Sequence, residues 1–234
     1  MNRKDVMGRL PDIKGILWDL DNTLYPLTAD FADHFNHRMA DVARECGVEV
    51  PHPELVALAE KSLQQHGYSG RVFIERFGLD RVALHYRIHE IVDETILERT
   101  TGLIEQFEQV PLDHAIVTHG SFDWALRVLE HIGLGRWFPR HRIHALETFD
   151  FHRKSESRRP FTEGLASLNL SEKNVVMVED TLHNLKVPYE MGLLTVLVTQ
   201  GQPPPRDLPG YVDIVCEDAL ALVQMMDKVR TKPL

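Results

Sequence analysis

Two aspartates, one residue apart, follow a short apolar run near the start of the chain. Residues 16–24 read ILWDLDNTL, so Asp19 and Asp21 come directly after or within an apolar segment. In an extended segment, residues i and i+2 lie on the same face, so the two carboxylates repel each other. A divalent cation, a nearby lysine or a chemical role for the pair would compensate this repulsion. The segment therefore indicates a reactive site, although a turn or a helix cap is the plain alternative.

Polar side chains also end two later apolar runs. Thr118 follows HAIV, and Glu179 and Asp180 end VVMVED. Taken singly, these could be a strand-end threonine and two solvated loop acids. In open α/β sheets, however, ligands bind beyond the carboxyl ends of the strands. These residues and the first aspartate pair all stand at strand ends. We therefore expect them to line one common crevice.

The elements that would position these side chains alternate between strand and helix from residue 112 onward. Such alternation predicts an α/β fold, a doubly wound (Rossmann-like) parallel sheet with helices on both faces. Pro188 is expected near a kink in its helix. Strands are expected at residues 13–18, 114–118, 142–146, 174–180 and 193–199, and helices at 121–133, 159–170 and 184–192, with a last strand and helix in 212–229.

The stretch between the first two strands has a different character. Residues 28–108 contain no convincing strand and indicate helices at 30–47, 51–67 and 79–96. Apolar residues recur there at helical spacing, and glycines end the first two helices. We therefore expect a helical insert at residues 28–108 within a core formed by residues 1–27 and 109–234.

Composition narrows the class of protein. The chain has 234 residues, enough for one large domain with a small insert, and its net charge of -9 argues against a nucleic acid polymer or an anionic membrane as main partner. Cys46 and Cys216 form no CxxC motif, no apolar run approaches membrane-spanning length, and the N-terminal segment lacks a signal-peptide core. We expect a cytoplasmic protein. A small anionic substrate remains compatible, because a local cation can dominate a pocket.

Together, these motifs resemble those of the haloacid dehalogenase-like superfamily of phosphohydrolases. Asp19-x-Asp21-x-Thr23 is similar to its first motif, Thr118 in IVTHG to its second, and Lys154 is the best candidate for its third. VEDTLHNL looks like the fourth. The similarity covers essentially the whole chain and implies that the helical insert is a cap. Within the superfamily, DNTLYP together with EDTLHNLKVPYEMGLLTVLV resembles the pyrimidine 5'-nucleotidase branch.

The resemblance implies a role for each residue. Asp19 would attack phosphorus and form an aspartyl-phosphate, and Asp21 would protonate the leaving alkoxide and then deprotonate the hydrolytic water. Lys154 would neutralise charge between Asp19 and the phosphate. Thr118 would bind a phosphate oxygen, and backbone N–H groups of the HGS segment, which includes His119 and Gly120, would donate to the phosphate.

A hard cation such as Mg²⁺ is also implied. It would bridge Asp19 and the phosphate, held as well by Asp180 and the backbone carbonyl of Asp21. Glu179 would be a further ligand or a neighbour of the ligands. Asn184 could orient Lys154 or the surroundings of the metal, and Thr23 would support the same site.

The chain departs from the family pattern at two places. The family has lysine-proline at the third motif, followed by an aromatic residue six positions after the lysine, whereas KSESRRPF has Ser155 and places Phe161 seven positions after Lys154. Arg153, Arg158 and Arg159 are alternatives for the same role. His119 stands where this branch often has asparagine, so its side chain could change the charge of the pocket.

The insert contains histidines that could contact a ligand, and the chain has three tryptophans. His89 would face the substrate, by resemblance to a cap histidine of this branch. His85 and His89 lie at i and i+4, but without an HExxH motif or a third ligand a zinc pair is not favoured. We expect Trp18, Trp124 and Trp137 to pack rather than to stack on a base; they are the three tryptophans of the chain.

The resemblance thus implies a Mg²⁺-dependent phosphomonoester hydrolase that acts on nucleoside 5'-monophosphates, with pyrimidines preferred. A sugar-phosphate phosphatase or phosphomutase would use the same core. A dehalogenase would need neither Asp21 as acid and base nor the metal-binding acids. A non-catalytic phosphate-binding protein is the remaining alternative, and the irregular KSESRRPF segment is its support.

Overall fold

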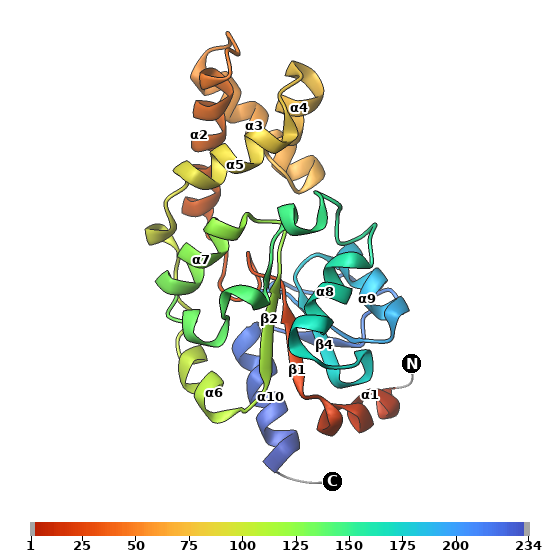
Figure 1. The fold of residues 1–234 in the computed structure, drawn as a ribbon. Coiled ribbons are helices and arrows are strands. Elements are labelled where there is room, and N and C mark those ends of the chain that lie inside the picture. Colours follow the sequence, from red (N-terminus) through yellow and green to blue (C-terminus); the bar gives the residue numbers. More distant parts are fainter. Residues whose placement is uncertain (1–2, 232–234) are drawn as a thin grey trace. The chain divides into compact units, whose positions relative to one another are not determined.

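The computed structural model describes residues 3–231, in which six parallel strands form one sheet (Figure 1). The strand order is β3-β2-β1-β4-β5-β6, and each neighbouring pair is parallel. This confirms the predicted doubly wound α/β fold. The strands are β1 (Gly15–Trp18), β2 (Asp113–Val117), β3 (Ile143–His144), β4 (Val175–Glu179), β5 (Leu194–Val198) and β6 (Ile214–Cys216).

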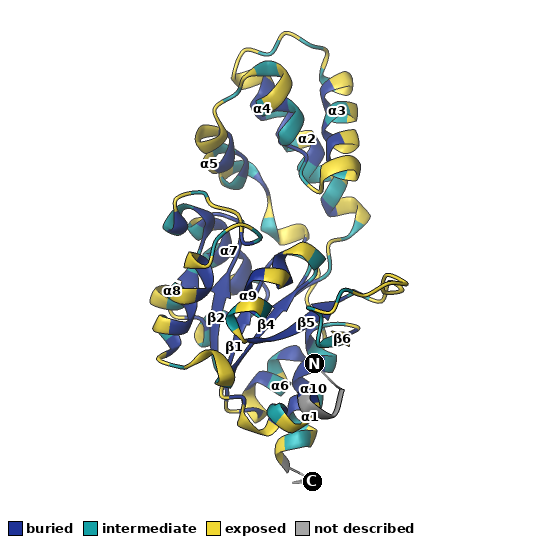
Figure 2. Ribbon diagram, turned by 90° about the vertical axis from the view of Figure 1, so that its right-hand side faces the viewer, coloured by how far each residue is buried: buried dark blue, intermediate teal, exposed yellow. Residues whose placement is uncertain are grey.

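The central strands are buried on both faces, as their continuous apolar sequences predict (Figure 2). On one face, Leu17 and Val117 pack with Phe161 of α8 (Arg159–Leu168) in one core cluster. A Cβ on Gly164 of α8 would lie 2.9 Å from the Leu17 side chain. A larger residue at this position would force the Leu17 side chain to shift, so the glycine allows this close approach of helix and sheet.

The opposite face of the sheet is covered by α6 (Leu103–Gln109) and α10 (Ala219–Thr231), which also contact each other. Phe107 of α6 stacks on Trp18 with a ring-centroid separation of 5.8 Å, and on His114 of β2 at 4.4 Å. Trp18 and Leu17 thus point to opposite faces, as neighbouring residues of a strand do.

Two more helices of the core lie next to strand ends. Ser121 caps α7 (Phe122–His131) by accepting a hydrogen bond from the Trp124 N–H. A 3₁₀ turn at Leu182–Leu185 precedes α9 (Lys186–Met191). Pro188 lies in the first turn of α9, where a missing N–H group is tolerated. The helix changes from 3₁₀ to α geometry just before this proline, close to where a kink is expected. A further helix, α1 (Arg3–Arg9), precedes β1.

The chain divides into two compact units, residues 27–97 and the remainder. The first comprises α2 (Ala29–Glu45), α3 (His52–His66), α4 (Arg71–Phe77) and α5 (Arg81–Ile91). Residues 98–108, which the sequence interpretation placed in the insert, belong to the other unit because α6 packs on the sheet. The termini of the expected core, residues 1–2 and 232–234, lie outside the described residues.

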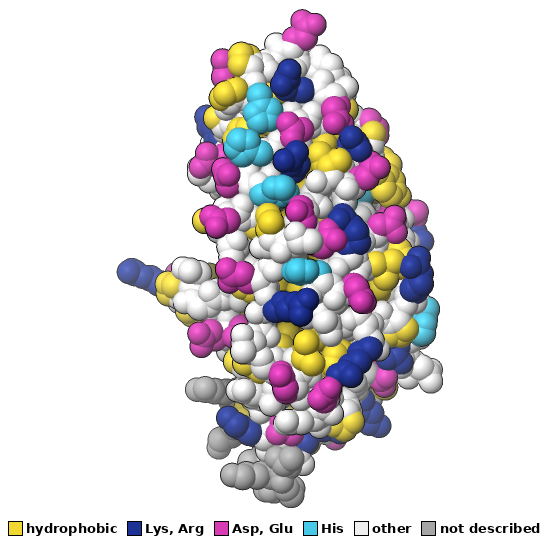
Figure 3. Space-filling model, turned by 90° about the vertical axis from the view of Figure 1, so that its left-hand side faces the viewer, with side chains coloured by type: hydrophobic (Ala, Val, Ile, Leu, Met, Phe, Trp, Pro, Cys, Tyr) yellow, Lys and Arg dark blue, Asp and Glu magenta, His cyan; other side chains and the backbone are white. Residues whose placement is uncertain are grey.

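The surface carries both signs of charge. Figure 3 shows acidic and basic side chains interspersed over one face, among scattered apolar ones. Among residues 3–231, no helix has the length and apolar character needed to cross a membrane.

Candidate active site

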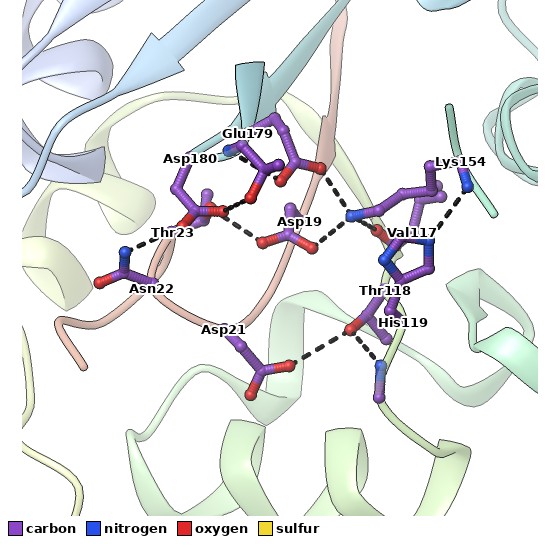
Figure 4. A network of polar contacts seen from close by, with 12 residues as sticks. Asp19, Asp21, Asn22, Thr23, Val117, Thr118, His119, Lys154, Glu179 and Asp180 are labelled. Carbon is purple, nitrogen blue, oxygen red and sulfur yellow. Dashed lines mark hydrogen bonds and ion pairs between the residues drawn. The ribbon is translucent and has the colours of Figure 1, made fainter. Parts of the chain in front are cut away.

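The predicted strand-end residues lie together at the carboxyl edge of the sheet (Figure 4). Asp19 follows β1, Thr118 follows β2, and Glu179 and Asp180 lie at the end of β4. Because β1 lies between β2 and β4 in the sheet, these three strand ends are adjacent. The Asp19 N–H donates to the Val178 carbonyl at 2.9 Å, and side chains and backbone groups of the three strand ends form the rest of the network.

A tight turn after β1 presents both aspartates. Asn22 has a left-handed backbone with φ of 59°, a conformation that asparagine tolerates better than most residues. The turn brings Thr23 back so that its hydroxyl donates to Asp19 Oδ2 at 3.0 Å. Gln200, which follows β5, donates from Nε2 to the Asn22 carbonyl at 3.0 Å and thus supports the turn from outside. Gln200 lies outside the motifs that predicted the site.

Lys154 is inserted between two acids. Its Nζ donates to Asp19 Oδ1 at 2.5 Å, to Glu179 Oε2 at 2.6 Å and to the Val117 carbonyl at 3.2 Å. The side chain is only 1% exposed. The structure thus places the Lys154 ammonium against Asp19 and Glu179, although Ser155 stands where the family has proline.

The alternative arginines do not join this network. Arg153 is exposed, Arg158 donates to the Glu190 carbonyl, and Arg159 pairs with Asp150 and Glu163 at the surface.

Burial shifts the pKa values of this group. Desolvation, followed by the charge of Glu179, raises the pKa of Asp19 to about 7 against the opposing effect of Lys154. Desolvation, and to a lesser degree the charge of Asp180, raises the pKa of Glu179 to about 7 against the same lysine. Desolvation lowers the pKa of Lys154, but the two carboxylates outweigh it and raise that pKa, so the lysine stays charged.

Asp21 has neutral neighbours instead. Its Oδ1 accepts hydrogen bonds from the Tyr25 hydroxyl at 2.5 Å and from the Trp124 indole N–H at 2.8 Å. Its Oδ2 lies 3.4 Å from the Thr118 hydroxyl. Tyr25 was not identified from the sequence, and Trp124 was expected only to pack. The signal in the sequence for the contact between Tyr25 and Asp21 is their spacing of four residues.

The segment after β2 links Thr118 to the lysine loop. The Gly120 N–H donates to Thr118 Oγ1 at 2.9 Å, and His119 Nε2 accepts from the Lys154 backbone N–H at 3.0 Å. The Phe122 N–H donates to Glu147 Oε1 at 2.7 Å. Thr118 thus lies beside Asp21 and Gly120 beside Thr118, while His119 contacts the protein backbone. The expected N–H contacts to phosphate stay a prediction.

The three acids at the strand ends fit a divalent cation. Asp19, Glu179 and Asp180 each offer a carboxylate oxygen within 4.8 Å of the others. Within residues 3–231, they form the one cluster of three or more possible metal ligands. Desolvation and the charge of Asp19 raise the pKa of Asp180, which indicates crowded negative charge that a cation would relieve. Asn22 Nδ2 donates to Asp180 Oδ2 at 2.9 Å, which orients that carboxylate.

Asn184 adds a second observation for this cation. It is buried, and its Oδ1 has no hydrogen-bond partner within the described residues. An unsatisfied buried carbonyl oxygen, on a residue four positions after Asp180, suits the water shell of a hard ion.

His89 belongs to the other unit. It lies on α5, where its Nδ1 is 2.7 Å from the His85 carbonyl and the two rings are 4.6 Å apart. Its predicted contact with substrate stays a prediction. The two histidines are not part of a cluster of three or more potential metal ligands within residues 3–231.

Comparison with known proteins agrees with this geometry. Residues 13–187 match the family of haloacid dehalogenase-like hydrolases. Comparison with curated protein sequences gave no match.

Solved structures share the fold. A haloacid dehalogenase-like family protein from Streptococcus pneumoniae superposes with a TM-score of 0.64 at 17% identity, covering 92% of this chain and 98% of the other. A HAD phosphatase from Thermococcus onnurineus gives 0.62 at 17% identity, with 92% and 98% covered. The L-2-haloacid dehalogenase of Xanthobacter autotrophicus, with chloropropionic acid covalently bound, gives 0.58 at 12% identity, with 91% and 98% covered.

Proposed function

Because the chain belongs to the family of haloacid dehalogenase-like hydrolases, we propose that it hydrolyses phosphate monoesters through an aspartyl-phosphate intermediate. One observation carries the proposal: a second carboxylate, Asp21, lies beside Asp19 with its Oδ2 directed toward Thr118. The structural neighbours include both dehalogenases and a phosphatase, so the residues of the site must separate these two chemistries.

The leaving group makes Asp21 informative. A halide leaves as a weak base and needs no proton, whereas an alkoxide is a strong base that leaves well only when an acid protonates it. A dehalogenase therefore has no use for a carboxylate at the position of Asp21. A phosphatase uses it twice, first as an acid and then as a base.

The steps follow from the groups present. Asp19 forms a bond to phosphorus while the bond from phosphorus to the leaving oxygen breaks, and Asp21 gives its proton to that oxygen. Water then bonds to phosphorus, its proton passes to Asp21, and the bond to Asp19 breaks. Lys154 stays charged throughout and offsets negative charge beside Asp19. Thr118 holds a phosphate oxygen.

Mg²⁺ is the proposed cofactor. Asp19, Asp180 and the backbone carbonyl of Asp21 would hold it, with Glu179 beside them. When bound, the ion would offset the charge of the phosphate as the carboxylate approaches it.

For the substrate, we propose a small phosphorylated metabolite, with a pyrimidine nucleoside 5'-monophosphate preferred. The support is the similarity of DNTLYP and EDTLHNLKVPYEMGLLTVLV to the pyrimidine 5'-nucleotidase branch. The net charge of -9 and the interspersed charges of Figure 3 also favour a small ligand over a nucleic acid polymer.

The test is product release from matched substrates. Phosphate release would be measured from UMP, CMP, AMP, GMP, glucose 6-phosphate and p-nitrophenyl phosphate, with Mg²⁺ or with EDTA, and chloride release from 2-chloropropionate. Asp19→Asn is the inactive variant, and Asp207→Asn, at an exposed aspartate, is the matched control.

We expect phosphate release that needs Mg²⁺, is lost in Asp19→Asn and persists in Asp207→Asn, with UMP and CMP as the best substrates. A leading sugar phosphate would overturn the substrate proposal and leave the reaction class intact. Chloride release without phosphate release would overturn the reaction class. Phosphate binding without turnover would favour the non-catalytic alternative.

A further inference from the structure

The two oxygens of Asp21 have different surroundings. Oδ1 accepts two hydrogen bonds, from the Tyr25 hydroxyl and the Trp124 indole N–H, at 2.5 and 2.8 Å. Oδ2 has the Thr118 hydroxyl at 3.4 Å. Both donors to Oδ1 are buried, whereas Asp21 is half-buried. One oxygen is therefore held by the protein, and the other lies on the side of the predicted phosphate ligand.

The Trp124 donor cannot reverse its role, because an indole N–H only donates. The Tyr25 hydroxyl, which is both a donor and an acceptor, donates to the ionised carboxylate. A proton placed on Oδ1 would lie against the indole hydrogen of Trp124, so Oδ1 is suited to accept.

From this geometry we propose that Tyr25 and Trp124 are positioning residues that confine the transferable proton of Asp21 to Oδ2, on the side of Thr118. The proposal rests on the function proposed above and adds residues to it. A carboxylate turns about a single bond, and two donors from separate elements fix that turn. A general acid that is fixed in this way needs less reorganisation when the leaving oxygen arrives.

The local structure supports a dedicated arrangement. Trp124 lies in the first turn of α7, and its backbone N–H is held by the Ser121 side chain at 3.2 Å. A Cβ on Gly120 would lie 2.9 Å from Trp124 Cδ1, so a glycine permits the indole to take this position. Tyr25 reaches Asp21 from the same loop, four residues later.

The test uses the leaving group as a probe. An alkyl phosphate such as UMP needs a proton on its leaving oxygen, whereas p-nitrophenolate departs without one. The quantity to measure is kcat/KM, which reports the reaction up to the first irreversible step and does not depend on hydrolysis of the intermediate. We expect Tyr25→Phe and Trp124→Phe to lower kcat/KM for UMP about tenfold and that for p-nitrophenyl phosphate about twofold or less.

Trp18→Phe is the matched control. Trp18 is also buried, and its indole N–H donates to His114 Nδ1 at 3.1 Å, away from Asp21. Its loss removes the same type of group, so we expect lower stability with an unchanged ratio of the two kcat/KM values. Thermal unfolding of all three variants would show that they fold.

Each outcome decides the proposal. A larger loss for UMP than for p-nitrophenyl phosphate in both site variants, absent from Trp18→Phe, supports it. Equal losses for the two substrates, no loss, or the same change of ratio in Trp18→Phe overturn it. If another alkyl phosphate leads the substrate panel, it replaces UMP. If the wild-type protein hydrolyses neither substrate, the proposed function itself is overturned. If the wild-type protein is active and the variants keep its activity, only the role of Tyr25 and Trp124 is overturned.

Discussion

Asp19 and Asp21 lie two residues apart on one loop but in opposite kinds of surroundings. Asp19 is fully buried among charges, with Lys154 at 2.5 Å and two further acids within reach. Asp21 is half-buried and contacts neutral donors only, from Tyr25, Trp124 and Thr118. In the proposed mechanism, the neighbours rather than the residue type give the two carboxylates different roles. The ammonium of Lys154 offsets the charge of Asp19, whereas Tyr25 and Trp124 orient the carboxylate of Asp21.

The largest effect should come from removing each carboxylate in turn. With p-nitrophenyl phosphate we expect Asp19→Asn to lower kcat on the order of 10⁴-fold, without any initial burst, because no covalent intermediate can form. Asp21→Asn should still release about one p-nitrophenolate per site and then stall, because water lacks its base. Rapid-quench measurement of the burst distinguishes the two. A burst in Asp19→Asn would contradict the assignment of the nucleophile.

Lys154 should dominate the stability of the Asp19 side. Lys154→Met leaves Asp19 and Glu179 buried without their cation, so the free energy of unfolding should fall by about 3–5 kcal/mol. Urea denaturation in EDTA measures this. Lys186→Met, at an exposed lysine 4.0 Å from Glu190, is the control and should change stability by less than about 0.5 kcal/mol. Equal small effects would show that the buried charges are compensated in another way.

The raised pKa values give a pH dependence with a definite sign. Folded Asp19 and Glu179 hold protons up to about pH 7, whereas their ordinary pKa values are 3.8 and 4.5. Between those limits the folded state binds more protons, so its stability falls as pH rises. In EDTA we expect Asp19→Asn to gain on the order of 2 kcal/mol over wild type between pH 4.5 and 8.

Measuring unfolding at several pH values, for both proteins, tests this expectation. Mg²⁺ should reduce the gain, because the ion favours the ionised carboxylates. A gain that shrinks as pH rises would have the wrong sign.

The smallest effect concerns the link between the loops. His119 Nε2 accepts from the Lys154 N–H at 3.0 Å, so His119→Ala should cost about 1 kcal/mol of stability and lower activity several-fold. His119→Gln, whose carbonyl oxygen can accept the same hydrogen bond, should restore part of both. Equal behaviour of the alanine and glutamine variants would show that the ring packs and does not hold the loop.

Sequence patterns predicted the fold, and they indicated the charged residues that the structure brings together around Asp19. Strand ends are set by apolar runs, and the parallel order then brings Asp19, Thr118 and Asp180 to one edge. Family resemblance, rather than spacing, selected Lys154 from four basic residues. The arginines nearby turn outward, which no pattern within KSESRRPF could show.

The neutral half of the site escaped prediction for a physical reason. The sequence predicts that Trp124 packs, but it does not show where an indole N–H points once it is buried. Tyr25 reaches Asp21 across a turn in which Asn22 takes a left-handed conformation, and that conformation is a property of the folded turn. Helix α6 was assigned to the insert because seven residues of helix carry no signal of the surface that they pack on.

The order of the strands also bears on how the chain acquires its site during synthesis. Strand β1 is made first, yet Gly15 pairs with Asp113 on one side and Val175 on the other. At ordinary rates of translation, β4 follows on the order of ten to thirty seconds after β1. Meanwhile, the helices of residues 27–97 contact one another and are synthesised before β2 and β4. The partners of this helical unit are therefore complete early, while Asp19 and Asp21 wait for β4, which is made in the last third of the chain.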